Sequence, residues 1–525
     1  MKTIRDRIIK GLLVGCFVFI SILQAVGHNT IVVNAADGDV QWGKNYGGSE
    51  NESIQSIIPT SDGGYIAVGE TYSVSTNLMT SHNALAEWGN EGFYDGIIVK
   101  MNADGSVAWA KNYGGARNEI FSSVIETQTG YLVVGTSTGA STNLGSNNWS
   151  NEGNNDGVIM EIDFNGDVQW AKNYGGAGTE IFSSVIKTQN GYLVVGYSDG
   201  VSTNLGIHNW SNEGSADGII MEIDSTGAVL WTSNYGGADG DYFSSVTATQ
   251  NGYLVVGGSE GASTNLGIHN WSNESYADGI IMEIGSTGTV LWAKNYGGVS
   301  NDEFSSVTKT QNGYLVVGYS QGVSTNLGSN NWSNEGSADG IIMEIDPTGD
   351  VQWAENYGGV NYDEFSSVIK TQTGYLVGGN SGGISTNIGS SNWSNEGDSD
   401  GIIMEIDSTG AVLWTSNYGG ADGDYFFSVI ETQTGYLVGG YSAGVSTNLM
   451  TSHNAPSEWG IVGNEDAILV LLDKPITIIP TPVPTPTVTP PTPATGVRGD
   501  VIVYMITTLL GMGIVMYKRK EDRYH

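Results

Sequence analysis

The sequence predicts an all-β protein: a seven-bladed β-propeller with four antiparallel strands per blade and a ring closed by the N-terminal strand, which completes the last blade. Three observations predict it. A strand tryptophan recurs every 61 residues from Trp109 to Trp414, after a first copy at Trp42, and each copy precedes Asn-Tyr-Gly-Gly. Seven Gly-Tyr strands and seven strands that begin with Asp fill the intervals. A long repeat of short strands is the signature of a propeller.

The two ends of the array predict how the ring closes. The repeat region opens on a lone fourth strand, residues 39–42, and ends on a third strand, residues 467–471. Pairing these two strands would complete the last blade and remove the open edges that a linear stack exposes. The strands are rich in β-branched and aromatic residues with Gly, Asn and Asp at the turns, and no stretch of the body shows helical periodicity.

The charge of the sequence limits the classes of partner that the protein can bind. Ten of the 19 Lys and Arg residues and 51 of the 55 Asp and Glu residues lie in residues 11–497, which leaves a net charge of −41 there. Such a body repels nucleic acid and anionic lipid surfaces. The only cysteine, Cys16, lies in the N-terminal leader, so we expect no disulfide in the mature chain.

The N-terminus reads as a secretory signal peptide over residues 1–35. Basic residues precede an apolar run from Leu12 to Val26, and Val33-Asn34-Ala35 offers small residues at the cleavage site. A retained membrane helix and a lipoprotein signal at Cys16 are the alternatives. Cleavage would leave residues 37–474 as the propeller, outside the cell.

A composition break at Pro475 starts the C-terminal region. Residues 475–495 are rich in Pro and Thr and predict an extended spacer that spans the cell wall. Residues 496–525 contain an apolar segment, 501–517, and a basic tail. A plain transmembrane helix over 501–517 is the alternative interpretation.

This C-terminal order resembles the Leu-Pro-x-Thr-Gly cell-wall sorting signal of Gram-positive surface proteins. The matching residues are Pro493, Thr495 and Gly496, whereas Thr492 stands where the family has Leu. The resemblance implies a sortase that cuts between Thr495 and Gly496, covalent attachment to peptidoglycan, and membrane contact only through the C-terminal segment. The repeat itself resembles a kelch-type blade in its strand Trp and in its closure by a terminal strand, although it is longer and keeps the double Gly in only three blades.

A second series of tryptophans lies in the long loops between the second and third strands. One interpretation is that these tryptophans form a ring of exposed aromatic side chains that stack on sugars or contact another ligand. The alternative is that each tryptophan packs its loop against the adjacent blade. The seven are Trp88, Trp149, Trp210, Trp271, Trp332, Trp393 and Trp459.

Other candidate sites are weaker. Glu396, Asp398 and Asp400 resemble the start of a calcium loop, without the closing glutamate, so calcium is a possible ligand and no other cofactor is expected. The loops of blades one and seven share a segment that contains His82 and His453, which mark one distinct sector of the ring.

The symmetry of the repeat favours binding over catalysis. We find no unrepeated catalytic constellation and therefore expect no enzyme. The predicted function is a surface-anchored, multivalent adhesin or lectin-like protein for a glycan or a host or matrix ligand. The alternatives are an extracellular polysaccharide-active enzyme with a central-channel site and a passive surface scaffold.

Overall fold

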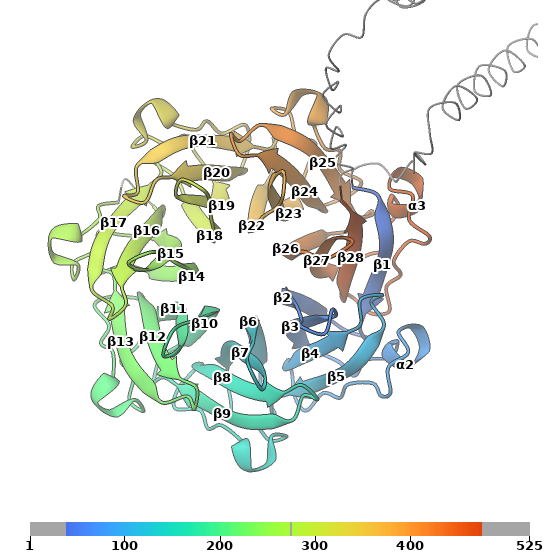
Figure 1. The fold of residues 1–525 in the computed structure, drawn as a ribbon, viewed down its shortest axis with the longest axis horizontal. Coiled ribbons are helices and arrows are strands. Elements are labelled where there is room, and N and C mark those ends of the chain that lie inside the picture. The colour runs from blue at the N-terminus through green and yellow to red at the C-terminus, as the bar shows by residue number, and fades with distance from the viewer. Residues whose placement is uncertain (1–37, 274–275, 475–525) are drawn as a thin grey trace, which may run out of the picture. The chain divides into compact units, whose positions relative to one another are not determined.

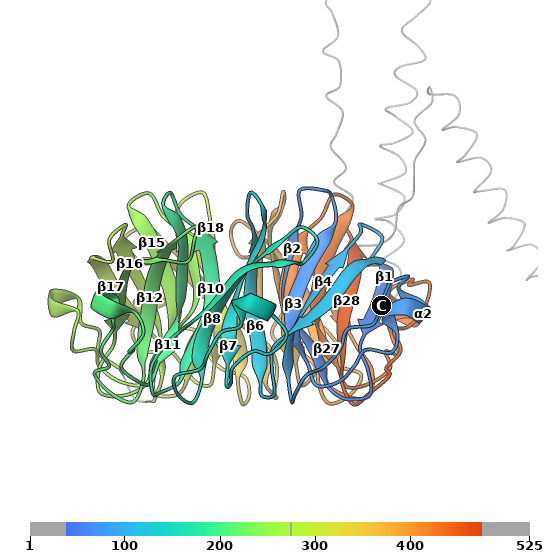
Figure 2. The same ribbon diagram turned by 90° about the horizontal axis from the view of Figure 1, so that it is seen from below.

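The computed structural model describes residues 38–273 and 276–474. The described chain forms seven four-stranded antiparallel sheets arranged around one axis, which confirms the predicted seven-bladed propeller (Figures 1 and 2). In each sheet the first strand lies nearest the axis and the fourth at the rim.

The blades follow one another along the chain. Blades one to three contain β2 (Glu52–Pro59), β3 (Tyr65–Thr71), β4 (Asp95–Met101), β5 (Val107–Tyr113); β6 (Glu119–Glu126), β7 (Gly130–Ser137), β8 (Asp156–Asp163), β9 (Val168–Tyr174); and β10 (Glu180–Lys187), β11 (Gly191–Ser198), β12 (Asp217–Asp224), β13 (Val229–Tyr235). Blades four and five contain β14 (Asp241–Ala248), β15 (Gly252–Ser259), β16 (Asp278–Gly285), β17 (Val290–Tyr296); and β18 (Asp302–Lys309), β19 (Tyr314–Ser320), β20 (Asp339–Ile345), β21 (Val351–Tyr357). Blades six and seven contain β22 (Asp363–Lys370), β23 (Gly374–Ser381), β24 (Asp400–Asp407), β25 (Val412–Tyr418); and β26 (Asp424–Glu431), β27 (Gly435–Ser442), β28 (Asp466–Asp473), with β1 (Val40–Tyr46).

The ring closes as the sequence predicts, through β1. This strand pairs antiparallel with β28, from Val40 opposite Leu472 to Tyr46 opposite Ala467. The side chain of Gln41 donates to Asp473 Oδ1 at 2.8 Å. Every blade therefore has four strands, and no blade leaves its third strand as an open edge.

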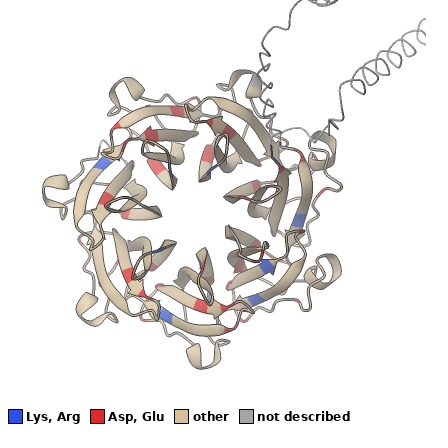
Figure 3. Ribbon diagram, in the orientation of Figure 1, with Lys and Arg blue, Asp and Glu red and all other residues tan. Residues whose placement is uncertain are grey.

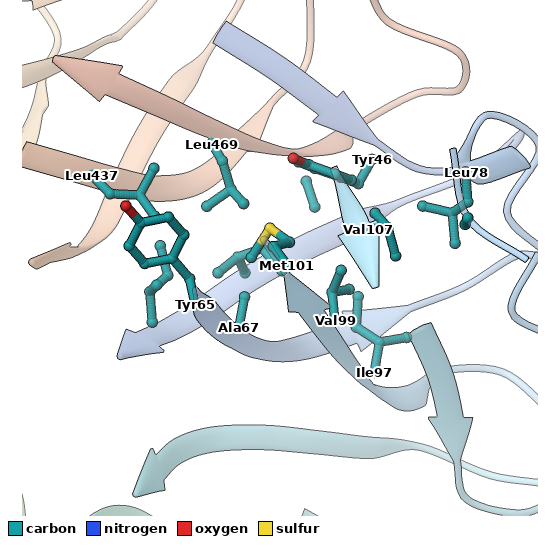
Figure 4. Close-up of a cluster of buried hydrophobic side chains, with 14 of the residues drawn as sticks. Tyr46, Tyr65, Ala67, Leu78, Ile97, Val99, Met101, Val107, Leu437 and Leu469 are labelled. Carbon is teal, nitrogen blue, oxygen red and sulfur yellow. The ribbon is translucent and has the colours of Figure 1, made fainter. Parts of the chain in front are cut away.

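The core lies between blades. Figure 4 shows the boundary between the last and first blades, where Leu437 and Leu469 face Tyr65 and Val99. Equivalent clusters fill the other six boundaries among the described residues. Each blade thus buries its apolar faces only against its neighbours, so stability depends on an unbroken ring.

The fourth strands are longer than predicted. The Asn-Tyr of each Asn-Tyr-Gly-Gly belongs to the strand and not to a loop, because Tyr113 pairs with Gly96 and its hydroxyl donates to Gly166 O of the next blade at 2.8 Å. The long loops run to the rim of the ring, where short helical turns lie beside the fourth strands (Figure 1). These turns are α2 (Leu78–Ser81), η1 (Gly145–Asn147), η2 (Gly206–His208), η3 (Gly267–His269), η4 (Gly328–Asn330), η5 (Gly389–Ser391) and α3 (Leu449–Ser452).

Candidate functional site

The seven loop tryptophans are buried. Their exposed fractions range from 1% to 3% for Trp88, Trp149, Trp210, Trp271, Trp332, Trp393 and Trp459. In blade two, Trp149 Nε1 donates to Ser137 Oγ and to Gly139 O, both at 3.1 Å. A buried indole has no free face for a sugar. The predicted aromatic platforms are therefore corrected: the alternative, packing of the loop, is what the structure shows, because each loop needs an apolar anchor to lie against the rim.

The predicted calcium ligands are not brought together. Asp400 is buried, and its Oδ2 accepts from Glu396 N at 2.9 Å and from Asn417 Nδ2 at 2.6 Å. The Glu396 and Asp398 side chains are exposed. Within residues 38–273 and 276–474, no group of three or more His, Cys, Asp and Glu side chains is arranged to hold a metal.

His82 and His453 do not form one site, because each packs on a tyrosine of a different strand. His82 stacks on Tyr46 of β1, with ring centroids 4.3 Å apart, and its Nε2 lies 2.6 Å from Asn45 O. His453 packs in the same way on Tyr418 of β25. Burial lowers the pKa of His82 to about 4, so this imidazole is neutral at physiological pH.

The predicted sorting residues Pro493, Thr495 and Gly496 lie outside the described residues, as do segments 1–35, 475–495 and 501–517. Among the helices that the structure does describe, none is long and apolar enough to cross a membrane.

A buried pair of carboxyl groups lies at each of the seven blade boundaries. At the first boundary, Glu119 accepts from Ser137 Oγ and Gly115 N, both at 2.9 Å. Asp95 accepts through Oδ2 from Asn112 Nδ2 at 2.6 Å. The pairs are Asp95 with Glu119, Asp156 with Glu180, Asp217 with Asp241, Asp278 with Asp302, Asp339 with Asp363, Asp400 with Asp424, and Asp466 with Glu52. Because all seven boundaries carry the pair, it belongs to the scaffold.

The first glycine of Asn-Tyr-Gly-Gly makes room for this pair. A Cβ on Gly114 would lie 2.9 Å from Asp95 Oδ1 and closer still to Glu119 Oε2. Burial, with a smaller contribution from the charge of Asp95, raises the pKa of Glu119 to about 7. Burial likewise raises the pKa of Asp95.

The described surface departs from the sevenfold pattern where the loops of blades one and two meet. A cavity of about 980 Å³ opens there. Its lining residues are Tyr72, Phe93, Tyr94, Ala116, Arg117, Asn118, Thr138, Gly139, Asn151, Gly153, Asn154 and Asn155. We call this cavity the blade 1–2 pocket.

One wall of the blade 1–2 pocket is aromatic. The ring of Tyr72 lies 5.0 Å from that of Tyr94 and 6.2 Å from that of Phe93, centroid to centroid. Phe93 is 56% exposed and Tyr72 37% exposed. Unlike the loop tryptophans, these rings offer faces to solvent. Tyr72 has no aromatic counterpart in the other six blades, where Thr138, Asp199, Glu260, Gln321, Gly382 and Ala443 stand.

Most of the other lining residues are polar. The side-chain amides of Asn118, Asn154 and Asn155 make no hydrogen bond to another described residue, whereas Asn151 uses its amide to bond Ser137 O at 3.0 Å. Arg117 stands beside them and is exposed. Free amides, a guanidinium and exposed rings that line one cavity are the elements of a site for a polar ligand with an apolar face.

A second asymmetric cluster lies on the innermost strands of blades four to six. Glu303 on β18 and Glu364 on β22 belong to neighbouring blades, and both innermost strands carry acidic colour in Figure 3. Tyr362 donates to Glu364 Oε2 at 3.2 Å, and its ring lies 5.6 Å from that of Tyr319. Burial, reinforced by the carboxylate of Glu303, raises the pKa of Tyr242 and of Tyr319.

Burial, with a smaller contribution from the charge of Glu303, raises the pKa of Glu364 above its ordinary value. The equivalent positions in the other five blades hold Ser53, Ile120, Ile181, Tyr242 and Tyr425. The sequence shows both glutamates as acidic residues that follow the fourth strands, and it does not show them as a pair, because they are 61 positions apart on the innermost strands of different blades.

The blade 1–2 pocket was also missed, although a signal existed. Tyr72, Phe93, Tyr94 and Arg117 are departures from the repeat, and aligning the seven units shows them. That these residues line one cavity could not be predicted from spacing, since Arg117 and Tyr72 are 45 positions apart and lie in different loops.

No protein-family model matches the chain, and no curated protein matches it. Solved structures give low-level similarities. Sqt1 from Chaetomium thermophilum is 10% identical with a TM-score of 0.39, over 84% of this chain and all of that one. CoXyl43, a GH43 β-xylosidase/α-arabinofuranosidase from a compost metagenome, is 9% identical with a TM-score of 0.25, over 56% of this chain and 94% of that one. A glycoside hydrolase family 43 arabinoxylan arabinofuranohydrolase from Bacillus subtilis is 12% identical with a TM-score of 0.26, over 86% and 95%.

The expectation that the chain is not an enzyme is withdrawn, and two of the similar structures are named as glycoside hydrolases. At such identities and TM-scores the likeness gives this chain neither a substrate nor a mechanism. The cluster of Glu303 and Glu364 also removes the ground for that expectation, since two unrepeated carboxyl groups lie on the innermost strands of neighbouring blades in the described part of the chain.

Proposed function

We propose that this chain is an extracellular carbohydrate-binding protein that uses one asymmetric site, the blade 1–2 pocket. The observation that carries the proposal is that exposed aromatic rings and unused side-chain amides line the same cavity. Multivalent binding by seven tryptophans is not part of the proposal, since those side chains are buried.

The chemistry of the pocket suits a saccharide. A sugar ring presents C–H groups on its faces and hydroxyl groups at its edge. Tyr72 and Phe93 offer apolar faces with electron-rich rings, which attract polarised C–H groups. Asn118 and Asn154 each offer a donor and an acceptor, which match neighbouring hydroxyls.

We also propose how the protein reaches its ligand. Residues 1–35 direct secretion, the propeller occupies 37–474, residues 475–495 cross the wall, and 496–525 are the sorting signal. A sortase would cut after Thr495 and join the protein to peptidoglycan, in a Gram-positive-type bacterium. The strand Trp and the closing strand support a kelch-like origin for the repeat.

The test of binding is a glycan array probed with residues 38–474, which contain all seven blades and the closing strand. We expect selective binding that is lost in the double variant Tyr72→Ala, Phe93→Ala. Tyr276→Ala is the matched control, because Tyr276 is 70% exposed at the position of Phe93 in blade four. No bound glycan, or equal loss in the control, would contradict the proposal.

A second candidate function is polysaccharide cleavage at the innermost strands. The observation that favours it is the position of Glu303 and Glu364 on the innermost strands of neighbouring blades, since glycoside hydrolysis uses one carboxyl group as acid and another as base or nucleophile. Release of reducing ends from plant or bacterial polysaccharides by the wild-type chain, abolished in Glu303→Gln and in Glu364→Gln but kept in Glu355→Gln, would establish it. Equal activity in all three variants would exclude these residues.

A further inference from the structure

We propose that the ligand of the blade 1–2 pocket carries a carboxylate, as an acidic saccharide built from uronic acid residues does, and that Arg117 receives it. This inference rests on the proposed function and names the class of sugar that the same site takes.

Arg117 reverses the charge of its position in the repeat. It is the only arginine in residues 38–474, the range that holds the described chain. It follows Asn-Tyr-Gly-Gly-Ala in the loop after β5. The equivalent residues in the other blades are Gly178, Asp239, Ser300, Asn361, Asp422 and Glu50, three of which are acidic.

The guanidinium of Arg117 is not committed elsewhere. The ion pairs of the described residues are formed by lysines, Lys100, Lys111, Lys294 and Lys474, and none involves Arg117. No hydrogen bond within the described chain uses its side chain either. An exposed arginine with no carboxylate partner is unusual in a chain of net charge −36, where Asp and Glu outnumber Lys and Arg by 55 to 19.

The stem of Arg117 lies on the pocket wall. A Cβ on Gly139 would sit 3.0 Å from both Cβ and Cδ of Arg117, so the aliphatic part packs against this glycine while the head remains exposed. Packing of the stem reduces the entropy lost when the head binds an anion.

A guanidinium suits a carboxylate better than a hydroxyl. Its planar fork donates two parallel N–H bonds to the two oxygens of a carboxylate, and such charge-assisted pairs are stronger than neutral hydrogen bonds. Asn118 and Asn154 would bond the hydroxyls of the same or the next residue, and Tyr72 would lie against a ring face. The surrounding negative charge disfavours adsorption of polyanions elsewhere on the body, which makes this site selective.

The experiment measures binding of two hexasaccharides to residues 38–474 by calorimetry. The first is a hexamer of galacturonic acid, and the second is its carboxyl-reduced neutral counterpart. We expect the acidic hexamer to bind at least about tenfold more tightly, the margin of one charge-assisted pair. Arg117→Gln should remove that margin and leave the affinity for the neutral hexamer unchanged. Lys187→Gln, which removes an exposed positive charge at the end of β10, should change neither.

Each other outcome has a distinct meaning. If both hexamers bind equally and Arg117→Gln has no effect, the carboxylate inference is wrong while carbohydrate binding stands. If neither hexamer binds and the glycan array is also negative, the proposed function fails and this inference fails with it. If a sulfated derivative of the carboxyl-reduced hexamer binds as tightly as the galacturonic acid hexamer, Arg117 recognises negative charge in general and the assignment to carboxylate is overturned.

Discussion

Asp95 and Glu119 bring two buried carboxyl groups together across the boundary of the first two blades, at the backbone of Gly114. Asp95 Oδ1 faces this meeting point without a hydrogen-bond donor among the described residues. A proton on one of the two groups would satisfy both, and the pair recurs at every boundary of the ring.

This pair predicts that the propeller is more stable in weak acid than at alkaline pH. The pKa of Glu119 is about 7 in the folded chain, against an ordinary value of 4.5 in the unfolded chain. The folded state therefore binds more protons between these values, and the free energy of unfolding is highest at low pH and falls as the pH rises through about 7. Melting curves at pH 5 and pH 8.5 should show a higher Tm at pH 5.

Glu119→Gln tests the source of that dependence. An amide cannot ionise. Between pH 5 and pH 8.5 the free energy of unfolding of the variant should therefore fall by on the order of 2 kcal/mol less than that of the wild type. Glu355→Gln is the control, because Glu355 is exposed on β21. A pH dependence unchanged in Glu119→Gln would show that other groups cause it.

Loop tryptophans should matter for stability, as their burial implies. Trp210→Ala is expected to lower the free energy of unfolding by about 3–5 kcal/mol, since it removes a large buried ring and its hydrogen bond to Ser198 Oγ. Ile207→Ala, in the same loop but 95% exposed, should change it by less than about 0.5 kcal/mol. Denaturant unfolding measures both, and similar values for the two variants would contradict the packing role.

Removal of the closing strand should open the ring. A chain that begins at Gly47 lacks β1, so the edge of β28 would be unpaired and available to a second chain. We expect loss of soluble monomer in size-exclusion chromatography and a less cooperative melting transition.

A rearranged chain supplies the control. Residues 39–46 attached after Asp473 through Ser-Thr-Gly would copy the turn found after Asp224 and place β1 beside β28 in its natural register. This chain should recover the monomer and the Tm. Failure of the rearranged chain to fold would show that closure depends on more than pairing of these two strands.

Calcium should have little effect on the propeller. Asp400 already accepts two hydrogen bonds through Oδ2, and Glu396 and Asp398 point to solvent. We expect millimolar calcium or EDTA to shift the Tm by less than about 1 °C, because a ligand stabilises a fold only if it binds the folded state. A larger shift would place a calcium site elsewhere on the chain.

The sequence predicted the architecture for a simple reason. Strand-forming runs at a 61-residue spacing leave four strands per unit, and the order of the end strands leaves one way to complete the seventh blade. The prediction from sequence was wrong at the Asn-Tyr of Asn-Tyr-Gly-Gly, where the turn-forming residues indicated a loop. Tyr113 is held in the strand by its hydroxyl bond to Gly166 O of the next blade, a contact that no local pattern reveals.

By itself, the sequence determined the number of blades, their strands and the strand that closes the ring, because these follow from periodicity along the chain. Only the tertiary structure decided which side chains are available for chemistry. Trp149 and Phe93 are both loop aromatics whose exposure the sequence leaves open, yet one is 3% and the other 56% exposed. Burial depends on residues brought from the next blade, and so does the cavity that Tyr72 and Arg117 both line.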